Sequence, residues 1–305
     1  MTVAPPPPHF LMRTLSCALL AMLVAWSASP TPRAENSADS AAWLDRINFY
    51  REIAALPPVV EEPRLSATIA QHARYMVAHD VIQHAQNRRR RWASPEGAAA
   101  AAVSNLAASR SAIEPDFWAV DTWMQAPFHA IGILDPALQH VGFGIHRAPD
   151  GKKIQTAAGL DVIRGRSNRP AAIQYPVVWP ADGSAVPISS HTGEFPSPLT
   201  SCSGYKAPTG LPLIVQMGSG AGVPHVTRTG IWDGTGWLEH CVFDESTYKN
   251  RDRDEQRLGR SILASRDAIV VIPREPLTFG SHYRVQIVVD RRRIDWTFRV
   301  EHLSN

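Results

Sequence analysis

The first half of the chain carries apolar residues at a helical period. Leu65, Ile69, Met76 and Val77 recur at the spacing that places side chains on one face of a helix. This pattern predicts an amphipathic helix over residues 65–79. Two further helices and a pair of strands are expected in this half, the helices at 40–56 and 117–124 and the strands at 141–146 and 154–160. The Ala-rich segment 97–108 is expected to be a helix or an irregular turn.

The second half changes to alternating apolar and polar positions with frequent Pro and Gly. Residues 283–289 and 296–300 alternate with a period of two and are separated by a short polar turn, which predicts a β-hairpin. Residues 213–217 and 268–272 are expected to be further strands. Several short strands with frequent turns are typical of a β-sandwich. Trp296 and Tyr283 are expected in its core, and an exposed Trp in this half is a candidate for carbohydrate binding.

The N-terminal residues resemble an export signal. Arg13 precedes an apolar run at Leu15–Trp26, which is shorter than the ~20 residues needed to cross a bilayer. We therefore expect a signal peptide at 1–34 and a secreted, extracellular or periplasmic protein without a transmembrane span after cleavage. A retained membrane anchor is the alternative.

The cysteine content fits an exported protein. Cys202 and Cys241 are the two cysteines that follow the expected signal, and an even pair outside the cytosol favours a disulfide. Two free buried thiols are the alternative.

Length and charge limit the function classes. The 305 residues suit two domains, and 44% hydrophobic residues suit packed cores. Lys and Arg number 31 against 28 Asp and Glu, a net charge of +3. This balance argues against a dedicated nucleic-acid-binding protein. The segment 165–170 is the expected linker between a domain at 35–168 and a β-sandwich, Ig-like or fibronectin-like, at 169–305.

Several motifs in residues 40–165 occur in a known order. They are Asn48-x-x-Arg51, Ala70–Met76 (AQHARYM), His84, Trp123–Pro136 (WMQAPFHAIGILDP) and Val141–Gly144 (VGFG). In this order they resemble the CAP superfamily, also called the SCP domain, which includes cysteine-rich secretory proteins, antigen 5 and pathogenesis-related proteins. The similarity is to its compact bacterial branch. The resemblance implies an α-β-α sandwich, so the fold class expected for the chain is α+β, with an all-β domain following.

The resemblance also implies a groove lined by two His and two Glu, which bind a divalent metal in some members. The histidines correspond to His84 and His129. The glutamates depart from the family pattern: the nearest match to its Gly-Glu-Asn motif is Ser104-Asn105, and Ala126 stands at the second Glu position. Glu96 is a candidate substitute. The expected groove residues are therefore His84, Glu96, Ser104, Asn105 and His129.

A metal is a candidate cofactor of this groove. Zinc takes three or four N, O or S ligands, and His84, His129 and Glu96 would supply three and leave a position for water. The sequence contains no G-x-S-x-G, P-loop or H-E-x-x-H motif, and no catalytic residue is assigned. An orienting pair of Asp121 and His129 is an alternative, although Asp121 is more simply a carboxylate on a helix surface.

The favoured function is a secreted binding or interaction module rather than an enzyme. Its partner would be a small apolar ligand, or an extracellular protein or cell-wall component, and not a nucleic acid. Two alternatives stay open. One is a metal-assisted extracellular hydrolase of peptides or cell-wall material, and the other is a structural or adhesive surface protein with a vestigial groove.

Overall fold

The computed structural model describes residues 39–149, 152–168 and 173–303. The signal peptide expected at 1–34 lies outside these residues. The described residues belong to one compact unit. In the part of the chain that is described, no helix combines the length and apolar character needed to cross a bilayer.

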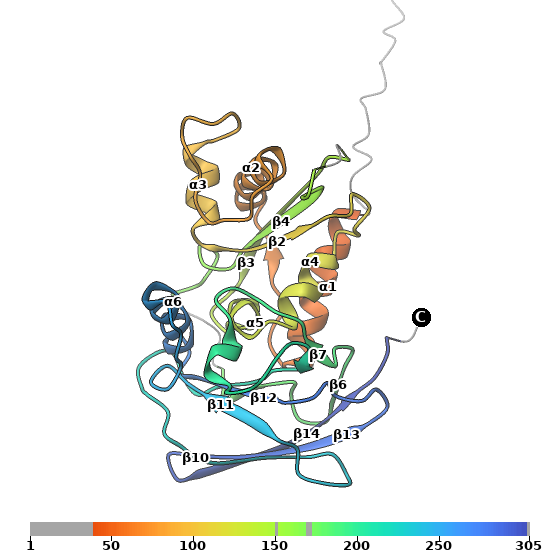
Figure 1. Cartoon of the computed structure of the whole chain (residues 1–305), viewed down its shortest axis with the longest axis vertical. Helices are drawn as coiled ribbons and strands as arrows, with labels where there is room; N and C mark the ends of the chain where they lie inside the picture. The colour runs from red at the N-terminus through yellow and green to blue at the C-terminus, as the bar shows by residue number, and fades with distance from the viewer. Residues whose placement is uncertain (1–38, 150–151, 169–172, 304–305) are drawn as a thin grey trace, which may run out of the picture. The chain divides into compact units, whose positions relative to one another are not determined.

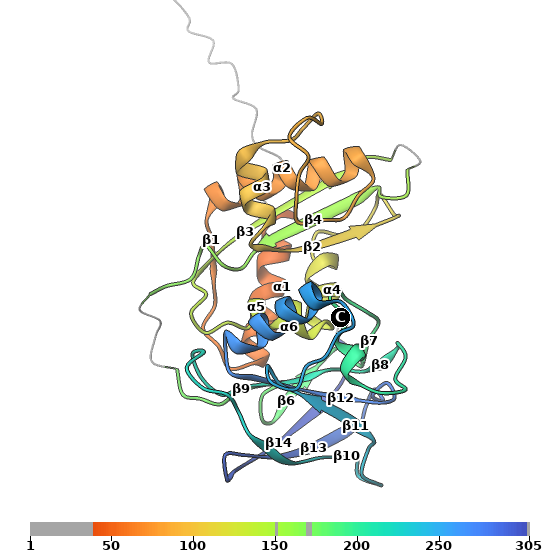
Figure 2. The same ribbon diagram turned by 60° about the vertical axis from the view of Figure 1, so that its left-hand side comes forward.

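The first half is an α-β-α sandwich (Figures 1 and 2), as the resemblance implied. Helices α2 and α3 cover one face of a four-stranded sheet, and α1, α4 and α5 lie on the other side. The strand order is β1-β3-β4-β2, with β1 parallel to β3 and the other pairs antiparallel. The elements are α1 (Asp39–Ile53), β1 (Val60–Glu61), α2 (Pro63–His79), α3 (Pro95–Ala101), β2 (Ser104–Ser109), α4 (Trp118–Met124), α5 (Pro127–Ile133), β3 (His140–Arg147) and β4 (Thr156–Asp161).

Helix α2 confirms the amphipathic pattern. Pro63 occupies its first turn, and Asp80 ends it in the left-handed conformation with φ 55°. Its buried face lies directly on the sheet at the V-G-F-G segment. A Cβ on Gly144 would lie 2.3 Å from the amide nitrogen of Ala70. This motif therefore uses glycine because the helix backbone approaches the strand too closely for any side chain.

The Asn48-x-x-Arg51 motif has a structural explanation. Arg51 is fully buried, and its guanidinium donates to the carbonyl oxygens of Pro57, Ile133, Asp135 and Leu138. The Asn48 side chain donates to and accepts from the backbone of Val59 at 3.0 and 2.8 Å. Both residues satisfy loop backbone groups that would otherwise be buried without partners.

The segment 97–108 differs from its expectation in part. Only its first residues are helical, in α3, and Ser104–Ser109 form strand β2. Alanine has a low intrinsic preference for strands, so the sequence pattern gave no strand signal. Pairing with β4 supplies the strand: Ala107 and Ala108 lie opposite Ala158 and Ala157.

The second half contains two four-stranded sheets with the strand orders β10-β13-β14-β6 and β11-β12-β9-β5, and a two-stranded pair β7-β8. All four segments expected as strands here are confirmed. The elements are β5 (Val177–Trp179), β6 (Ser184–Val186), β7 (Ser190–His191), η1 (Pro198–Ser201), β8 (Thr209–Gly210), β9 (Leu213–Gln216), β10 (Val226–Trp232), β11 (His240–Phe243), α6 (Arg253–Ala264), β12 (Ala268–Pro273), β13 (His282–Val289) and β14 (Arg292–Val300).

One helix, α6, accompanies these strands, so the second half is not purely β. The Asp252 carboxylate caps it by accepting from the amides of Asp254 and Glu255 at 2.8 and 3.1 Å. Helix α6 contacts α5 and β12 and buries Leu263. The sequence does carry a start signal for this helix, Asp252 with Glu255 three residues later, although this signal stands among strand patterns.

The Cys202–Cys241 disulfide is confirmed, with the two Cα atoms 5.5 Å apart. It ties the residue after η1 to strand β11. Trp296 and Tyr283 are both buried, 3% exposed each, as expected for core residues.

The two halves share one apolar core, in which Phe128 packs against Phe243 and Tyr248, and they also contact each other through charged and polar groups. Buried Asp135, from the first half, forms ion pairs with Arg166 at 2.6 Å and with Arg266 of the second half. The Gln216 side chain donates to the carbonyl oxygen of Leu134 at 2.8 Å. The domain boundary between 35–168 and 169–305 stays a prediction, because part of the expected linker lies outside the described residues.

Candidate functional site

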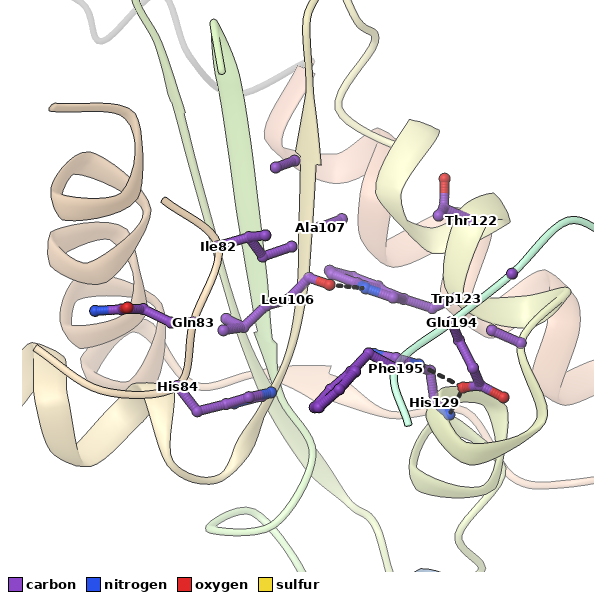
Figure 3. A pocket seen from close by; sticks show the side chains of 13 residues that line it. Ile82, Gln83, His84, Leu106, Ala107, Thr122, Trp123, His129, Glu194 and Phe195 are labelled. Carbon is purple, nitrogen blue, oxygen red and sulfur yellow. Dashed lines mark hydrogen bonds and ion pairs between the residues drawn. The ribbon is translucent and has the colours of Figure 1, made fainter. Parts of the chain in front are cut away.

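A cavity of about 590 Å³ opens between strand β2, helices α4 and α5, the loop after α2 and the segment 193–195 (Figure 3). Most of its lining is apolar, and two histidines enter it. The lining residues are Ile82, Gln83, His84, Leu106, Ala107, Ala108, Thr122, Trp123, Ala126, His129, Gly193, Glu194 and Phe195. The structure therefore brings His84 and His129 to one cavity, as the resemblance implied.

Strand β2 and helix α4 build the floor of this cavity. The indole nitrogen of Trp123 donates to the carbonyl oxygen of Leu106 at 3.1 Å, which fixes the ring against the strand. Trp123 is 1% exposed and Leu106 6% exposed. Both are anchored core residues that turn one surface toward the cavity, so the floor is rigid and apolar.

Helix α5 positions His129. Pro127 opens the helix, and the N-cap residue Ala126 has no side-chain acceptor for the free amides. Glu194 supplies one from the second half of the chain: its carboxylate accepts from the amides of Phe128 and His129 at 3.1 and 3.3 Å. The same carboxylate lies 2.7 Å from Nδ1 of His129. The Glu194 side chain is only 1% exposed.

These contacts fix the tautomer of His129. A carboxylate oxygen can only accept, so Nδ1 of His129 carries the hydrogen. In a neutral ring, Nε2 is then left as a hydrogen-bond acceptor. His84 has the same arrangement, because its Nδ1 donates to the carbonyl oxygen of Ala101 at 2.7 Å. Its side chain points from the loop after α2 into the cavity, toward Phe195 (Figure 3).

Ser104 and Asn105 line a second, adjoining cavity of about 260 Å³, which also includes His84, His129 and Phe195. The Ser104 hydroxyl donates to the carbonyl oxygen of Ala100 at 2.8 Å, so its hydrogen is directed away from an imidazole. The Asn105 amide donates to the carbonyl oxygen of His129 at 3.0 Å. Both side chains hold the cavity wall in place.

Glu96 is not brought to either cavity. It lies exposed in the first turn of α3 and is absent from the residues lining the two cavities. Within the described ranges, no group of three or more His, Cys, Asp or Glu side chains is arranged to hold a metal ion. The donor set present does not fit a metal centre, and we derive no metal chemistry from it. The predicted ligand set of His84, His129 and Glu96 is therefore not assembled in the described residues, and whether the protein binds a metal stays untested.

The alternative pair of Asp121 and His129 is not formed. Asp121 instead accepts from the hydroxyl of Tyr50 at 2.7 Å and lies 3.2 Å from Nε of Arg46. Burial raises the pKa of the Asp121 carboxyl, and its contacts with Tyr50 and Arg46 oppose that rise. This carboxylate joins α4 to α1 and is separate from the groove histidines.

Sequence analysis missed Glu194 and Phe195. Both lie in a short connection after β7, far outside the motifs that identified the groove, and the segment H-T-G-E-F-P carries no periodic pattern. The absence of a family-type Glu near His129 was the one available signal that a carboxylate from elsewhere in the chain takes this place.

Comparison with known families supports the geometry. Residues 44–159 match the model of the cysteine-rich secretory protein family, CAP. A search of curated protein sequences found no significant match.

Proposed function

We propose that this chain, whose residues 44–159 match the CAP family, is an extracellular binding protein. Its groove holds a small, mostly apolar molecule with one end that donates a hydrogen bond. The Cys202–Cys241 disulfide supports a location outside the cytosol, where such bonds persist. The apolar lining of the cavity and its two histidines define the chemistry of the ligand.

The observation that carries the proposal is the cavity of about 590 Å³ with an anchored apolar floor and two histidines. Pockets that bind small molecules in proteins have volumes of roughly 300–1,000 Å³ and are mainly apolar with a few placed polar groups. Burying apolar ligand surface in such a cavity supplies the affinity, and the polar groups fix its orientation.

The histidines define the polar end of the ligand. Since Nδ1 of His84 and Nδ1 of His129 both donate to protein oxygens, a ring that is neutral has only Nε2 left, as an acceptor. A ligand hydroxyl satisfies such an acceptor, whereas an ether or a ketone cannot. We therefore assign an apolar alcohol as the ligand class.

Phe195 sets the ligand length. Its ring lines both the cavity of about 590 Å³ and the adjoining one of about 260 Å³, and it is 65% exposed. The ring therefore lies between the two spaces without being locked into a core. Phe195→Ala is expected to join them and to favour longer alcohols.

Calorimetric titration of the full chain with dodecanol, and with dodecyl methyl ether as the matched control, tests the ligand class. Saturable binding of the alcohol, with the ether at least tenfold weaker, is expected because the ether has no hydrogen to donate. Equal binding of the two would contradict the role of the histidines. Absence of binding to either would favour the structural or adhesive alternative.

A further inference from the structure

A second surface, remote from the groove in sequence, carries an exposed aromatic ring on the sheet β10-β13-β14-β6. Trp237 is 60% exposed, although it is one of the largest apolar side chains of the protein. Its ring lies over Gly230 of β10, where a Cβ would come within 2.7 Å of the indole. The ring of Trp232 meets it edge-on, with centroids 5.4 Å apart. Glycine at 230 therefore leaves room for the indole against the strand, while most of the Trp237 residue stays exposed to solvent.

The hairpin that carries Trp237 is well ordered by its own hydrogen bonds. The Asp233 carboxylate accepts from the amides of Thr235 and Gly236 at 2.8 and 2.7 Å. Directly after the indole, the Leu238 amide donates to the carbonyl oxygen of Ile231 at 2.8 Å. An exposed ring held in one position loses little conformational entropy when a ligand stacks on it.

Planar polar side chains stand beside the indole. Gln286 of β13 lies opposite Gly230, and Arg284 lies opposite Trp232. Their neighbours Tyr283, Val285 and Ile287 are buried, so Arg284 and Gln286 occupy the outer face. On β14, Asp295 lies opposite Gln286, and its two carboxylate oxygens accept from Nε and Nη2 of Arg293 at 2.6 and 2.7 Å.

This face has an excess of positive charge. Arg228, Arg284, Arg293 and Arg299 belong to it. Asp295 pairs with Arg293 and lies 3.9 Å from Arg284, and Glu301 pairs with Arg299. Asp182 adds a third carboxylate, because it accepts from the Thr297 hydroxyl on the same face at 3.0 Å. Among the described residues named here, four cations therefore stand against three carboxylates. Arg284 is 62% exposed at its side chain, so it is available to an anionic group.

We propose that this face binds an acidic polysaccharide, with a sugar ring stacked on Trp237 and a uronate carboxylate on Arg284. The apolar C–H face of a pyranose suits a flat indole, and the side chains of Gln286 and Asp295 offer donors and acceptors to its hydroxyl groups. A guanidinium binds a carboxylate through parallel hydrogen bonds. Trp and Arg are also enriched at protein interfaces, so binding of neither polymer would overturn the proposal and leave a protein partner as the occupant of this face.

The test is affinity electrophoresis of the full chain in polygalacturonate, at physiological ionic strength, with an uncharged glucan as the second polymer. The wild-type protein is expected to be retarded by polygalacturonate and much less by the glucan. Trp237→Ala is expected to weaken binding about tenfold, or about 1.4 kcal/mol. Trp237→Phe should retain part of the affinity, and Arg284→Gln should weaken polygalacturonate binding without changing the melting temperature.

The matched control is Val223→Ala, which removes an apolar side chain of similar exposure, 59%, elsewhere on the surface. It should bind as the wild type does. The proposal is overturned if the wild-type protein binds neither polymer, if it binds both equally, or if Trp237→Ala binds polygalacturonate as tightly as the wild type.

Discussion

Nδ1 of His129 lies 2.7 Å from a carboxylate oxygen of Glu194, a residue 65 positions later in the chain. The same carboxylate accepts two amides at the start of α5, so one side chain both orients the groove histidine and caps its helix. A CAP domain that lacks the glutamates of the family pattern in its own sequence thus receives a carboxylate from the segment that follows it. This relationship makes the groove a product of both halves of the chain.

Replacing Glu194 should therefore destabilise the protein. Glu194→Ala leaves two amides and a histidine without their acceptor. A hydrogen bond to a charged group contributes about 1.5–3 kcal/mol to stability. We expect a loss of about 2 kcal/mol in the free energy of unfolding, measured by urea denaturation. Glu96→Ala is the matched control: this exposed carboxylate should change stability by less than about 0.5 kcal/mol. Similar losses in both variants would contradict the assignment.

The close approach of α2 to β3 predicts that Gly144→Ala is destabilising. The added methyl would lie 2.3 Å from the amide nitrogen of Ala70, and a helix backbone cannot yield as a side chain does. Overpacking of this kind costs about 1–3 kcal/mol. Gly222→Ala, where a Cβ would meet nothing within 4 Å, is the control and should stay within about 0.5 kcal/mol of the wild type. Thermal unfolding of the two variants side by side decides the point.

Asp135 should be among the most sensitive polar positions. It is fully buried between Arg166 and Arg266, so Asp135→Asn leaves two guanidinium groups with too little compensating charge. Removing one partner of a buried ion pair costs about 3–5 kcal/mol. Chemical denaturation should show this loss, while Asp254→Asn, which breaks an exposed pair with Arg257, should cost less than about 1 kcal/mol.

His72 should make stability fall in mild acid. Burial lowers its pKa to about 4, an effect increased by His84 and opposed by the hydrogen bond to the Gln83 carbonyl oxygen. Its pKa in the unfolded chain is about 6.5, so the unfolded state takes up the proton first as the pH falls. Stability is therefore full above the unfolded value and declines between pH of about 6.5 and 4, by about 3 kcal/mol in total.

His72→Gln should flatten this part of the pH profile. Burial also lowers the pKa of His191, so a smaller decline in the same direction should persist in the variant. Unfolding free energies measured across this pH range test both statements. An identical slope in wild type and variant would rule out His72 as the source.

Metal analysis separates the binding proposal from a metal-assisted hydrolase. The full chain, purified without chelator, is expected to contain less than stoichiometric metal, since the described residues present no group of three ligands. Zinc should leave its melting temperature unchanged. One equivalent of bound zinc in the wild-type protein that is absent from His84→Ala/His129→Ala would contradict this expectation. That result would favour the metal-assisted hydrolase.

Most of the fold could be predicted from the sequence, because the patterns that define its helices and strands are local. The periodic positions of Leu65, Ile69 and Met76 define α2, and the alternation around Tyr283 defines β13. The motifs that resemble the CAP family pointed to His84 and His129, and both of these histidines line one cavity. Strand β2 was missed because an Ala-rich segment has a low intrinsic preference for strands. Helix α6 carries a local start signal, Asp252 followed by Glu255, which the surrounding strand patterns obscured.

Only part of the groove could be predicted from the sequence. Glu194 reaches His129 through tertiary packing of the second half, and no spacing rule links a residue of an irregular connection to a helix 65 positions earlier. Glu96, by contrast, was chosen for its nearness in sequence to His84 and lies exposed on α3. Nearness along the chain was therefore a poor guide to which carboxylate meets the groove.

The most direct test of the central claim is dodecanol binding, measured by titration calorimetry, in Ile82→Asp and Ile113→Asp. Ile82 lines the groove cavity and Ile113 does not, and both are exposed, at 55% and 90%. The account predicts that Ile82→Asp loses at least about tenfold in affinity, about 1.4 kcal/mol, while Ile113→Asp binds as the wild type. Unchanged binding in Ile82→Asp, or equal losses in both variants, would contradict an apolar ligand site in this groove.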